Sequence, residues 1–262
     1  MNYSLSNMLS SSGGAFNPLT LSPVVWFDGA DENTMFDSTS GGSIVAPGAA
    51  IARWEDKSGN ARHATQSTVI NRPIRTASGQ NGKNVVTFDG TNDRLNFARF
   101  DLTASTFFLV TKLTSANTFQ QVFQAIQSST TRGAIECGLN NSSTFGPILV
   151  GSNANSTPYG KGGTLGTNTT RILTGKWLGG GTSGASNYEM RVNGAAITLS
   201  NSNSLGAAAG TSSLIGAAFS AGNIVSFFGG YICELIICNA NLSAALVSKT
   251  ETYLSKKWGV TI

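Results

Sequence analysis

The stretch that decides the fold lies between residues 23 and 97. It reads PVVWFDGADENTMFD (23–37), IARWEDKSGNARHATQ (51–66) and NRPIRTASGQNGKNVVTFDGTNDRLNF (71–97). Short apolar runs alternate there with turns of Asp, Asn, Gly and Ser, which is typical of antiparallel strands joined by tight turns. Four of the runs are predicted strands: Val24–Phe27, Ile51–Trp54, Val85–Phe88 and Leu95–Phe97. We therefore expect an all-β protein.

The rest of the chain continues this pattern and ends in a helix. Further strands are predicted at 107–110, 122–126, 134–139, 147–151, 171–178, 188–192, 213–215, 225–228 and 231–238. Segments rich in Gly, Ser, Asn and Thr at 152–170, 179–187 and 200–212 are predicted loops. Ser243 as N-cap and Gly259 as C-cap delimit a predicted helix over 244–258. Its apolar side chains form one stripe, which is expected to pack on the sheets.

The opening stretch and the segment FFGGYICELIICNANLSAALVSKTETYLSKKWG (227–259) together resemble a known family. They are similar to the two ends of the laminin-G-like, concanavalin-A-like domains of bacterial and phage proteins. The resemblance implies a two-sheet antiparallel jelly-roll sandwich, which we expect to carry a C-terminal helix. It implies no single activity, because this fold serves lectins, glycan hydrolases, adhesion modules and virion proteins.

Two segments are expected: an N-terminal arm at 1–20 and a laminin-G-like jelly-roll domain at 21–262. The arm is rich in Ser, Asn and Gly and has too few apolar side chains to order itself. It must pack either along its own domain or against a neighbouring subunit, and we favour the neighbour. A homo-oligomer is accordingly expected.

Composition limits the kinds of partner. Charged residues make up 11% of the 262, against about 25% in ordinary globular proteins. A surface of small neutral polar groups costs less to bury against another protein, although small β-rich proteins share this composition. The net charge of +4 is scattered along the chain, so no nucleic-acid partner is expected. No apolar run is long enough to cross a membrane, and the N-terminus lacks the features of a secretory signal.

The cysteines are expected to be buried thiols. Cys233 and Cys238 lie five apart in one predicted strand, which places them on opposite faces and prevents a disulfide between them. Cys137 is the third, and no spacing typical of a zinc site is present.

The sequence predicts no catalytic residues and a protein that is not an enzyme. His63 is the only histidine, and it follows a turn where a structural role is expected. Glycan hydrolases of this fold carry alternating carboxylates on one strand, and no such alternation occurs here. Glu234 interrupts the apolar strand YICELIIC and is either a ligand or metal carboxylate or a structural hydrogen-bond acceptor.

Calcium is the one cofactor that the resemblance raises, because laminin-G-like domains often hold it with loop oxygens. Asp89, Asn92 and Asp93 offer such oxygens in one turn, as do Asp28 and Asp31. The same residue types also build turns without an ion. We therefore predict no metal and no cofactor.

Two functions follow from these observations. The first is a virion structural protein, a capsid decoration or cement subunit or a fibre component on a phage surface, made in the host cytoplasm and bound to other capsid or tail proteins. The alternative is a carbohydrate-binding adhesion module that recognises cell-surface glycans through the loops at 152–170 and 179–187. The candidate ligand-binding residues for this role are Tyr159, Lys161 and Tyr188.

Overall fold

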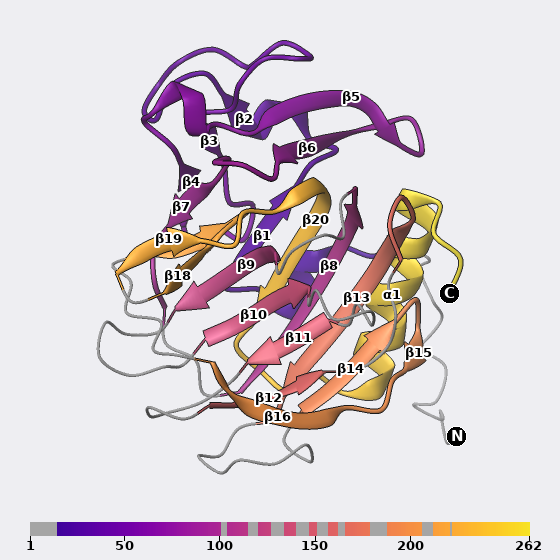
Figure 1. Cartoon of the computed structure of the whole chain (residues 1–262). Helices are drawn as coiled ribbons and strands as arrows, with labels where there is room; N and C mark the ends of the chain where they lie inside the picture. Colours follow the sequence, from indigo (N-terminus) through magenta and orange to yellow (C-terminus); the bar gives the residue numbers. More distant parts are fainter. Residues whose placement is uncertain are drawn as a thin grey trace, which may run out of the picture.

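Two antiparallel sheets packed face to face, with one helix on the outer face of the first, make up the structure (Figure 1). It is a computed structural model, and it describes residues 15–100, 104–114, 120–126, 134–139, 147–150, 157–161, 166–178, 188–205, 212–220 and 222–262. Every strand pair in these ranges is antiparallel. The predicted all-β jelly-roll sandwich with a C-terminal helix is therefore confirmed.

The first sheet, called sheet I here, is built around strand β20. Its strands are, in order, β15 (Ala195–Ala196), β14 (Tyr188–Val192), β13 (Thr170–Trp177), β8 (Ser105–Leu113), β20 (Gly229–Cys238), β6 (Lys83–Asp89) and β5 (Ile74–Gln80). The strand β1 (Val25–Asp28) pairs with the second half of β20, beyond the part that pairs with β6. The predicted strands at the two ends of the chain therefore lie side by side.

The second sheet, sheet II, covers the inner face of sheet I. Its order is β16 (Ser200–Leu205), β12 (Thr157–Lys161), β11 (Pro147–Val150), β10 (Ala134–Leu139), β9 (Gln120–Ile126), β17 (Ser213–Ile215), β7 (Leu95–Phe97), β4 (Ala64–Thr65), β3 (Arg53–Trp54) and β2 (Met35–Phe36). A separate hairpin joins β18 (Ala218–Ser220) to β19 (Asn223–Val225). Short 3₁₀ helices lie at η2 (Pro18–Leu21), η3 (Glu32–Thr34) and η4 (Val69–Asn71).

Strand β8 shows why some strands are apolar on both faces. Phe107 and Leu109 point into the core between the sheets, where Phe107 meets Phe123 of sheet II at a centroid distance of 5.1 Å. Phe108 and Val110 point to the opposite face, into a second cluster. Both faces are buried, as the uninterrupted apolar run predicts.

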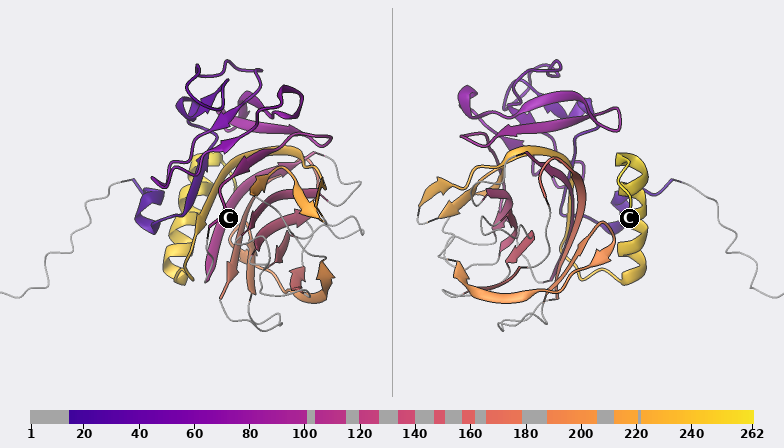
Figure 2. Two further views of the ribbon diagram at one scale, coloured as in Figure 1. Left: turned by 90° about the vertical axis from the view of Figure 1, so that its left-hand side faces the viewer. Right: turned by 45° about the vertical axis from the view of Figure 1, so that its right-hand side comes forward.

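That second cluster lies under helix α1 (Ala244–Trp258), which packs on β13 and β8 (Figure 2). The helix contributes Val247, Leu254 and Trp258 to it. The Ser243 side chain accepts a hydrogen bond from the Leu246 amide, and Gly259 ends the helix with φ +66°, as predicted for the two caps.

The tip of the β5–β6 hairpin caps the end of this helix. The Gln80 amide donates to the carbonyl of Trp258 at 2.7 Å, and the Asn81 amide donates to the carbonyl of Lys257 at 3.0 Å. Last-turn carbonyls have no partner within a helix, so these side chains satisfy groups that would otherwise need water. The hairpin and the helix thereby hold each other in place.

A bulge in β20 corrects the prediction for the two cysteines of this strand. The register with β8 shifts between Ile232 and Glu234, so Cys233 is an extra residue in the ladder. In a regular strand, side chains five positions apart point to opposite faces. Because of the extra residue, Cys233 and Cys238 point to the same face, and both lie in the cluster under the helix. Both are buried free thiols, as expected.

Three predicted boundaries are wrong. The expected loop 152–170 contains β12, which pairs with β16, and β16 in turn lies in the expected loop 200–212. Two polar segments therefore form strands by pairing with each other, without the apolar alternation that marks a strand in a sequence. The strand expected at 225–228 ends at Val225, because Ser226 adopts a left-handed conformation with φ +59°.

The last part of the predicted arm packs on its own chain. The ring of Phe16 lies 5.3 Å from that of Tyr253 on α1, and Leu21 is buried in the cluster under the helix. Phe16 of the predicted arm thus contacts the domain of its own chain, as does Leu21, the first residue of the predicted domain. The expected contact of the arm with a neighbouring subunit stays a prediction. Residues 1–14 lie outside the described part of the chain, and the boundary at residue 21 stays a prediction.

Candidate functional site

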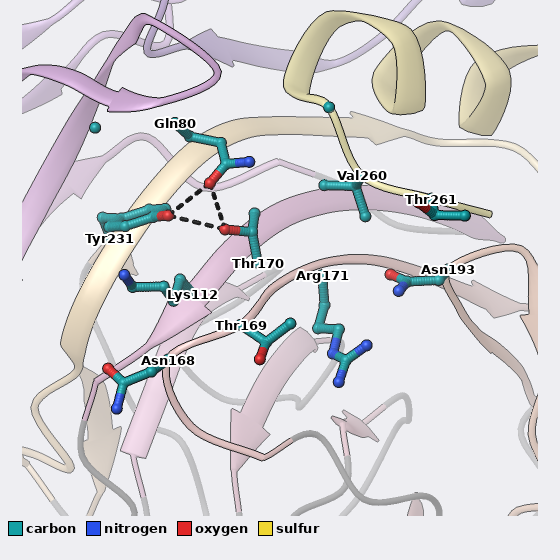
Figure 3. Close-up of a pocket in the computed structure, with 12 residues that line it drawn as sticks. Gln80, Lys112, Asn168, Thr169, Thr170, Arg171, Asn193, Tyr231, Val260 and Thr261 are labelled. Carbon is teal, nitrogen blue, oxygen red and sulfur yellow. Dashed lines mark hydrogen bonds between the residues drawn. The ribbon is translucent and has the colours of Figure 1, made fainter.

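A polar pocket opens where the hairpin tip, the start of β13 and the segment after α1 meet (Figure 3). Its volume is about 480 Å³, within the range of about 300–1,000 Å³ that is usual for ligand pockets. The lining is Gly79, Gln80, Lys112, Asn168, Thr169, Thr170, Arg171, Asn193, Tyr231, Gly259, Val260 and Thr261. Hydroxyl and amide groups dominate this set, and none of its twelve described members carries a carboxylate.

Three oxygen atoms form a closed cluster on one side of the pocket. The Gln80 Oε1 lies 2.6 Å from Thr170 Oγ1 and 2.9 Å from the Tyr231 hydroxyl, and the two hydroxyls lie 2.8 Å apart. Burial raises the pKa of Tyr231, so the phenol keeps its proton. The two hydroxyls have only two protons to donate within the cluster, while each oxygen atom has two lone pairs. More lone pairs than protons are present, so some lone pairs of the cluster stay unused. The cluster can accept hydrogen bonds from a ligand that brings its own donors.

A row of side chains across sheet I leads into this cluster. Lys112 on β8 stands directly opposite Thr170 on β13 and Tyr231 on β20, so the three side chains project from the same face of the sheet. The Lys112 ammonium lies 4.9 Å from the centroid of the Tyr231 ring, which is a cation–π contact. Arg171, the next residue along β13, directs its guanidinium away from Gln80 and Tyr231 (Figure 3).

Glu234 occupies a different place, in the interior between β20 and α1. Its carboxylate is fully buried and accepts hydrogen bonds from Trp26 Nε1 at 2.9 Å, Trp258 Nε1 at 2.7 Å and the Tyr253 hydroxyl at 3.1 Å. Lys257 forms an ion pair with it at 2.8 Å. Each carboxylate oxygen is thus occupied by groups of the protein itself, as the structural alternative for Glu234 requires.

The ion pairs continue from Glu234 to the first strand. Lys257 also lies 2.7 Å from Asp28 Oδ1, and Lys57 bridges Asp28 at 2.9 Å and Asp31 at 2.7 Å. Asp28 and Asp31 were one of the two candidate calcium sets. Here an ammonium group takes the position between the carboxylates that a cation would need.

The other candidate calcium set, Asp89 to Asp93, forms a hydrogen-bonded turn. The carboxylate of Asp89 accepts from the amides of Thr91, Asn92 and Asp93, and that of Asp93 accepts from the amide of Asp89 at 3.0 Å. These contacts are the ones by which Asx side chains stabilise turns without an ion. Within the described residues no group of three or more His, Cys, Asp or Glu side chains is placed to hold a metal.

The variant Asp93→Asn is expected to raise the melting temperature at about pH 7.5 and to change it little at about pH 4.5. Burial, followed by the charge of Asp89, raises the pKa of Asp93 from 3.8 to about 6. A carboxyl with a raised folded-state pKa is costly to ionise, so the native protein loses stability as the pH rises from about 4 through about 6. Asn cannot ionise and escapes that loss. Thermal unfolding of the native protein and of the variant between these pH values measures the two melting temperatures. A difference between them that does not grow with pH contradicts the prediction.

His63 has the structural position that the sequence predicts. Its Nδ1 accepts a hydrogen bond from the backbone amide of Asp56 at 3.1 Å, beside the turn at 56–60. The carboxylate of Asp56 in turn accepts from the amides of Trp26, Ser58 and Arg62. Among the described residues this backbone amide is the hydrogen-bond partner of the imidazole, and no nucleophilic side chain is bonded to it.

Of the three predicted ligand-binding residues, only Tyr188 has a side chain in the described part of the structure. Tyr188 is 6% exposed and belongs to the core between the sheets, so its ring offers no open surface. Tyr159 and Lys161 lie on β12, with backbone partners on β11 and β16, and their side chains are outside the described part of the structure. The loop at 179–187 is outside it too.

The pocket residues were missed because nothing in the sequence marks them as a set. Gln80 precedes the Asn81–Gly82 turn, which the sequence does predict, and Tyr231 opens the apolar strand around Glu234. Gln80 is however 90 positions from Thr170 and 151 from Tyr231. The clue that was available is the polar side chain at the end of each of these strands.

Fold and pocket together define a concanavalin-A-like β-sandwich domain with a polar cavity beside its C-terminal helix. No protein-family model and no curated protein matches the sequence. Solved structures do match, at low identity.

Within the described residues, no helix is both long and apolar enough to cross a membrane.

One similar structure is the Trypanosoma rangeli sialidase in complex with the inhibitor DANA. The identity is 12% and the TM-score 0.53, over 92% of this chain and 34% of the sialidase. The chain thus spans about a third of the length of that enzyme. At this identity the likeness shows the fold alone.

A second similar structure is a separate domain of a larger protein. It is domain 4 of AbnA, a GH43 extracellular arabinanase from Geobacillus stearothermophilus, in complex with arabinotriose. The identity is 16% and the TM-score 0.51, over 79% of this chain and 99% of that domain. The present chain and that domain therefore share a β-sandwich of similar extent.

Proposed function

We propose that this protein is a non-enzymatic glycan-binding module that holds its ligand in the pocket beside Gln80, Thr170 and Tyr231. The observation that carries the proposal is the cluster of three oxygen atoms that shares two protons. Sugars present many hydroxyl groups that donate and accept, and such a cluster suits them because it has acceptor capacity left. The fold supports the same role, since the similar AbnA domain is in complex with an oligosaccharide.

The chemistry of the pocket supports binding without turnover. Glycoside hydrolysis needs two carboxyl groups about 5–10 Å apart on either side of the scissile bond. The described lining holds hydroxyls, amides, one ammonium and one guanidinium, and no Asp, Glu or His. A ligand placed there would be bound through hydrogen bonds and released unchanged.

A glycan array followed by calorimetric titration tests the proposal. Thr170→Val keeps the shape of the side chain and removes one oxygen of the cluster, so affinity for the array hit, or for arabinotriose, is expected to fall about fivefold to tenfold. The matched control is Thr68→Val, because Thr68 is exposed and its side chain makes no capping hydrogen bond. Absence of any glycan ligand, or equal affinity of both variants, would refute the proposal.

The virion role stays a prediction from the resemblance to bacterial and phage laminin-G-like domains. The solved structures described above support glycan binding better than they support a capsid or tail position. The two roles are compatible, since a protein on a virion surface can bind host glycans. We therefore propose a location on a virion, virion partners and a homo-oligomer only together with this role. Detection of the protein on purified particles would test all three.

A further inference from the structure

We infer that the pocket selects acidic sugars and that Lys112 is the residue that recognises their carboxylate. This inference rests on the proposed glycan-binding function and narrows its ligand class. It is carried by the placement of Lys112 in one row with Thr170 and Tyr231, on the side of the sheet where the pocket opens. The ammonium and the hydroxyl cluster thus face the same space (Figure 3).

The charge of Lys112 is not used within the described structure. Lys57, Lys176 and Lys257 each form a salt bridge with a carboxylate. Among the described residues Lys112 has no such bridge, and its ammonium makes a cation–π contact with Tyr231. Its side chain is half-buried, so water screens the ammonium less than it would on the open surface. A half-buried cation without a carboxylate partner favours an anionic ligand.

The neighbouring groups fix what kind of anion fits. A small inorganic anion would use the ammonium alone and leave the unused lone pairs of the Thr170 and Tyr231 hydroxyls without donors. A sugar acid supplies both parts, a carboxylate for Lys112 and hydroxyl donors for the oxygen cluster. Because neither a carboxylate nor an imidazole lies in the described lining, nothing there repels that charge. Uronic acids and sialic acids share this chemistry.

The test compares a trigalacturonate with its methyl ester, which has the same shape without the charge. The native protein is expected to bind the acid at least about tenfold more tightly than the ester at low salt. Lys112→Met should abolish the difference by weakening binding of the acid, and Lys112→Arg should restore it. Lys256→Met is the control, because Lys256 is exposed on α1 and does not line the pocket. Sialyllactose and lactose form a second pair that distinguishes sialic from uronic acids.

The outcomes separate this inference from the function beneath it. If acid and ester bind equally and Thr170→Val weakens both, the pocket binds glycans and the inference about Lys112 is wrong. If neither pair binds and the array is empty, the proposed function fails first. If Lys112→Met lowers binding of acid and ester alike, its role is structural and the acidic preference is overturned. Salt that weakens the acid and not the ester supports recognition of charge.

Discussion

Replacing Lys257 by Met is expected to lower the free energy of unfolding by about 3–5 kcal/mol. The ammonium of Lys257 lies between two carboxylates, 2.7 Å from Asp28 and 2.8 Å from Glu234. Removing one partner of a buried ion pair leaves the other charge in the interior without compensation, and here two are left. Glu234 is the more costly of them, because its side chain has no exposed surface.

The loss should depend on pH in a definite direction. Burial, followed by the charge of Asp28, raises the pKa of Glu234, and Lys257 opposes that shift. Without Lys257 the pKa of Glu234 rises further, so in the folded variant Glu234 takes up a proton at low pH and part of the cost of the buried charge is avoided. The difference between variant and native protein is therefore expected to be smaller near pH 5 than near pH 8, by roughly 1 kcal/mol or more.

Urea unfolding at two pH values measures both effects. Lys256→Met is the matched control, since it removes the same charge from the adjacent exposed position and should change stability by less than about 0.5 kcal/mol. The double variant Lys257→Met, Glu234→Gln should recover part of the loss by removing one uncompensated charge. A loss below about 1 kcal/mol for the single variant would mean that the ion pairs are not formed as described.

Replacing Gly230 by Ala is expected to cost about 3 kcal/mol or more. A Cβ atom at this position would lie 2.1 Å from the backbone oxygen of Lys112 and 2.6 Å from Cζ of Phe228. The nearest atom belongs to the backbone of the adjacent strand, so no rotation of a side chain relieves the clash. The two strands β8 and β20 would have to separate at the end of their pairing, where Gly230 stands opposite Leu113.

Gly222→Ala separates this clash from the general cost of replacing a glycine. At Gly222 no atom lies within 4 Å of the added Cβ, and the positive φ of +82° alone should cost about 1–2 kcal/mol. Chemical denaturation of both variants gives the comparison. Equal losses would show that β8 and β20 are less closely spaced at Gly230 than the structure has them.

The fold could be predicted largely because burial of strands leaves a pattern in the sequence. The run at 107–110 is apolar on both faces since the helix covers one face and sheet II the other. Ser243 and Gly259 mark the helix by local capping chemistry. Where pairing alone makes a strand, as for β12 and β16, the sequence carries no such pattern and was interpreted as loop.

The candidate site could not be predicted, and the bulge in β20 explains part of the difficulty. A strict alternation from Tyr231 to Cys238 assigns Cys233 and Glu234 to opposite faces, whereas both side chains lie on the side of the helix. One inserted residue changes which side chains face the pocket, the core and the helix. The aromatic and charged residues that looked most like a binding surface, such as Tyr188, are core residues or fall outside the described part.

The Gln80 side chain belongs at once to the pocket and to the end of the helix. Its oxygen faces Thr170 and Tyr231, while its nitrogen donates to the Trp258 carbonyl. A sugar that binds this amide would be connected through it to the last turn of α1, the helix on the outer face of sheet I. Loss of the hydrogen bond between Gln80 and the Trp258 carbonyl would therefore disturb the pocket as well as the helix end.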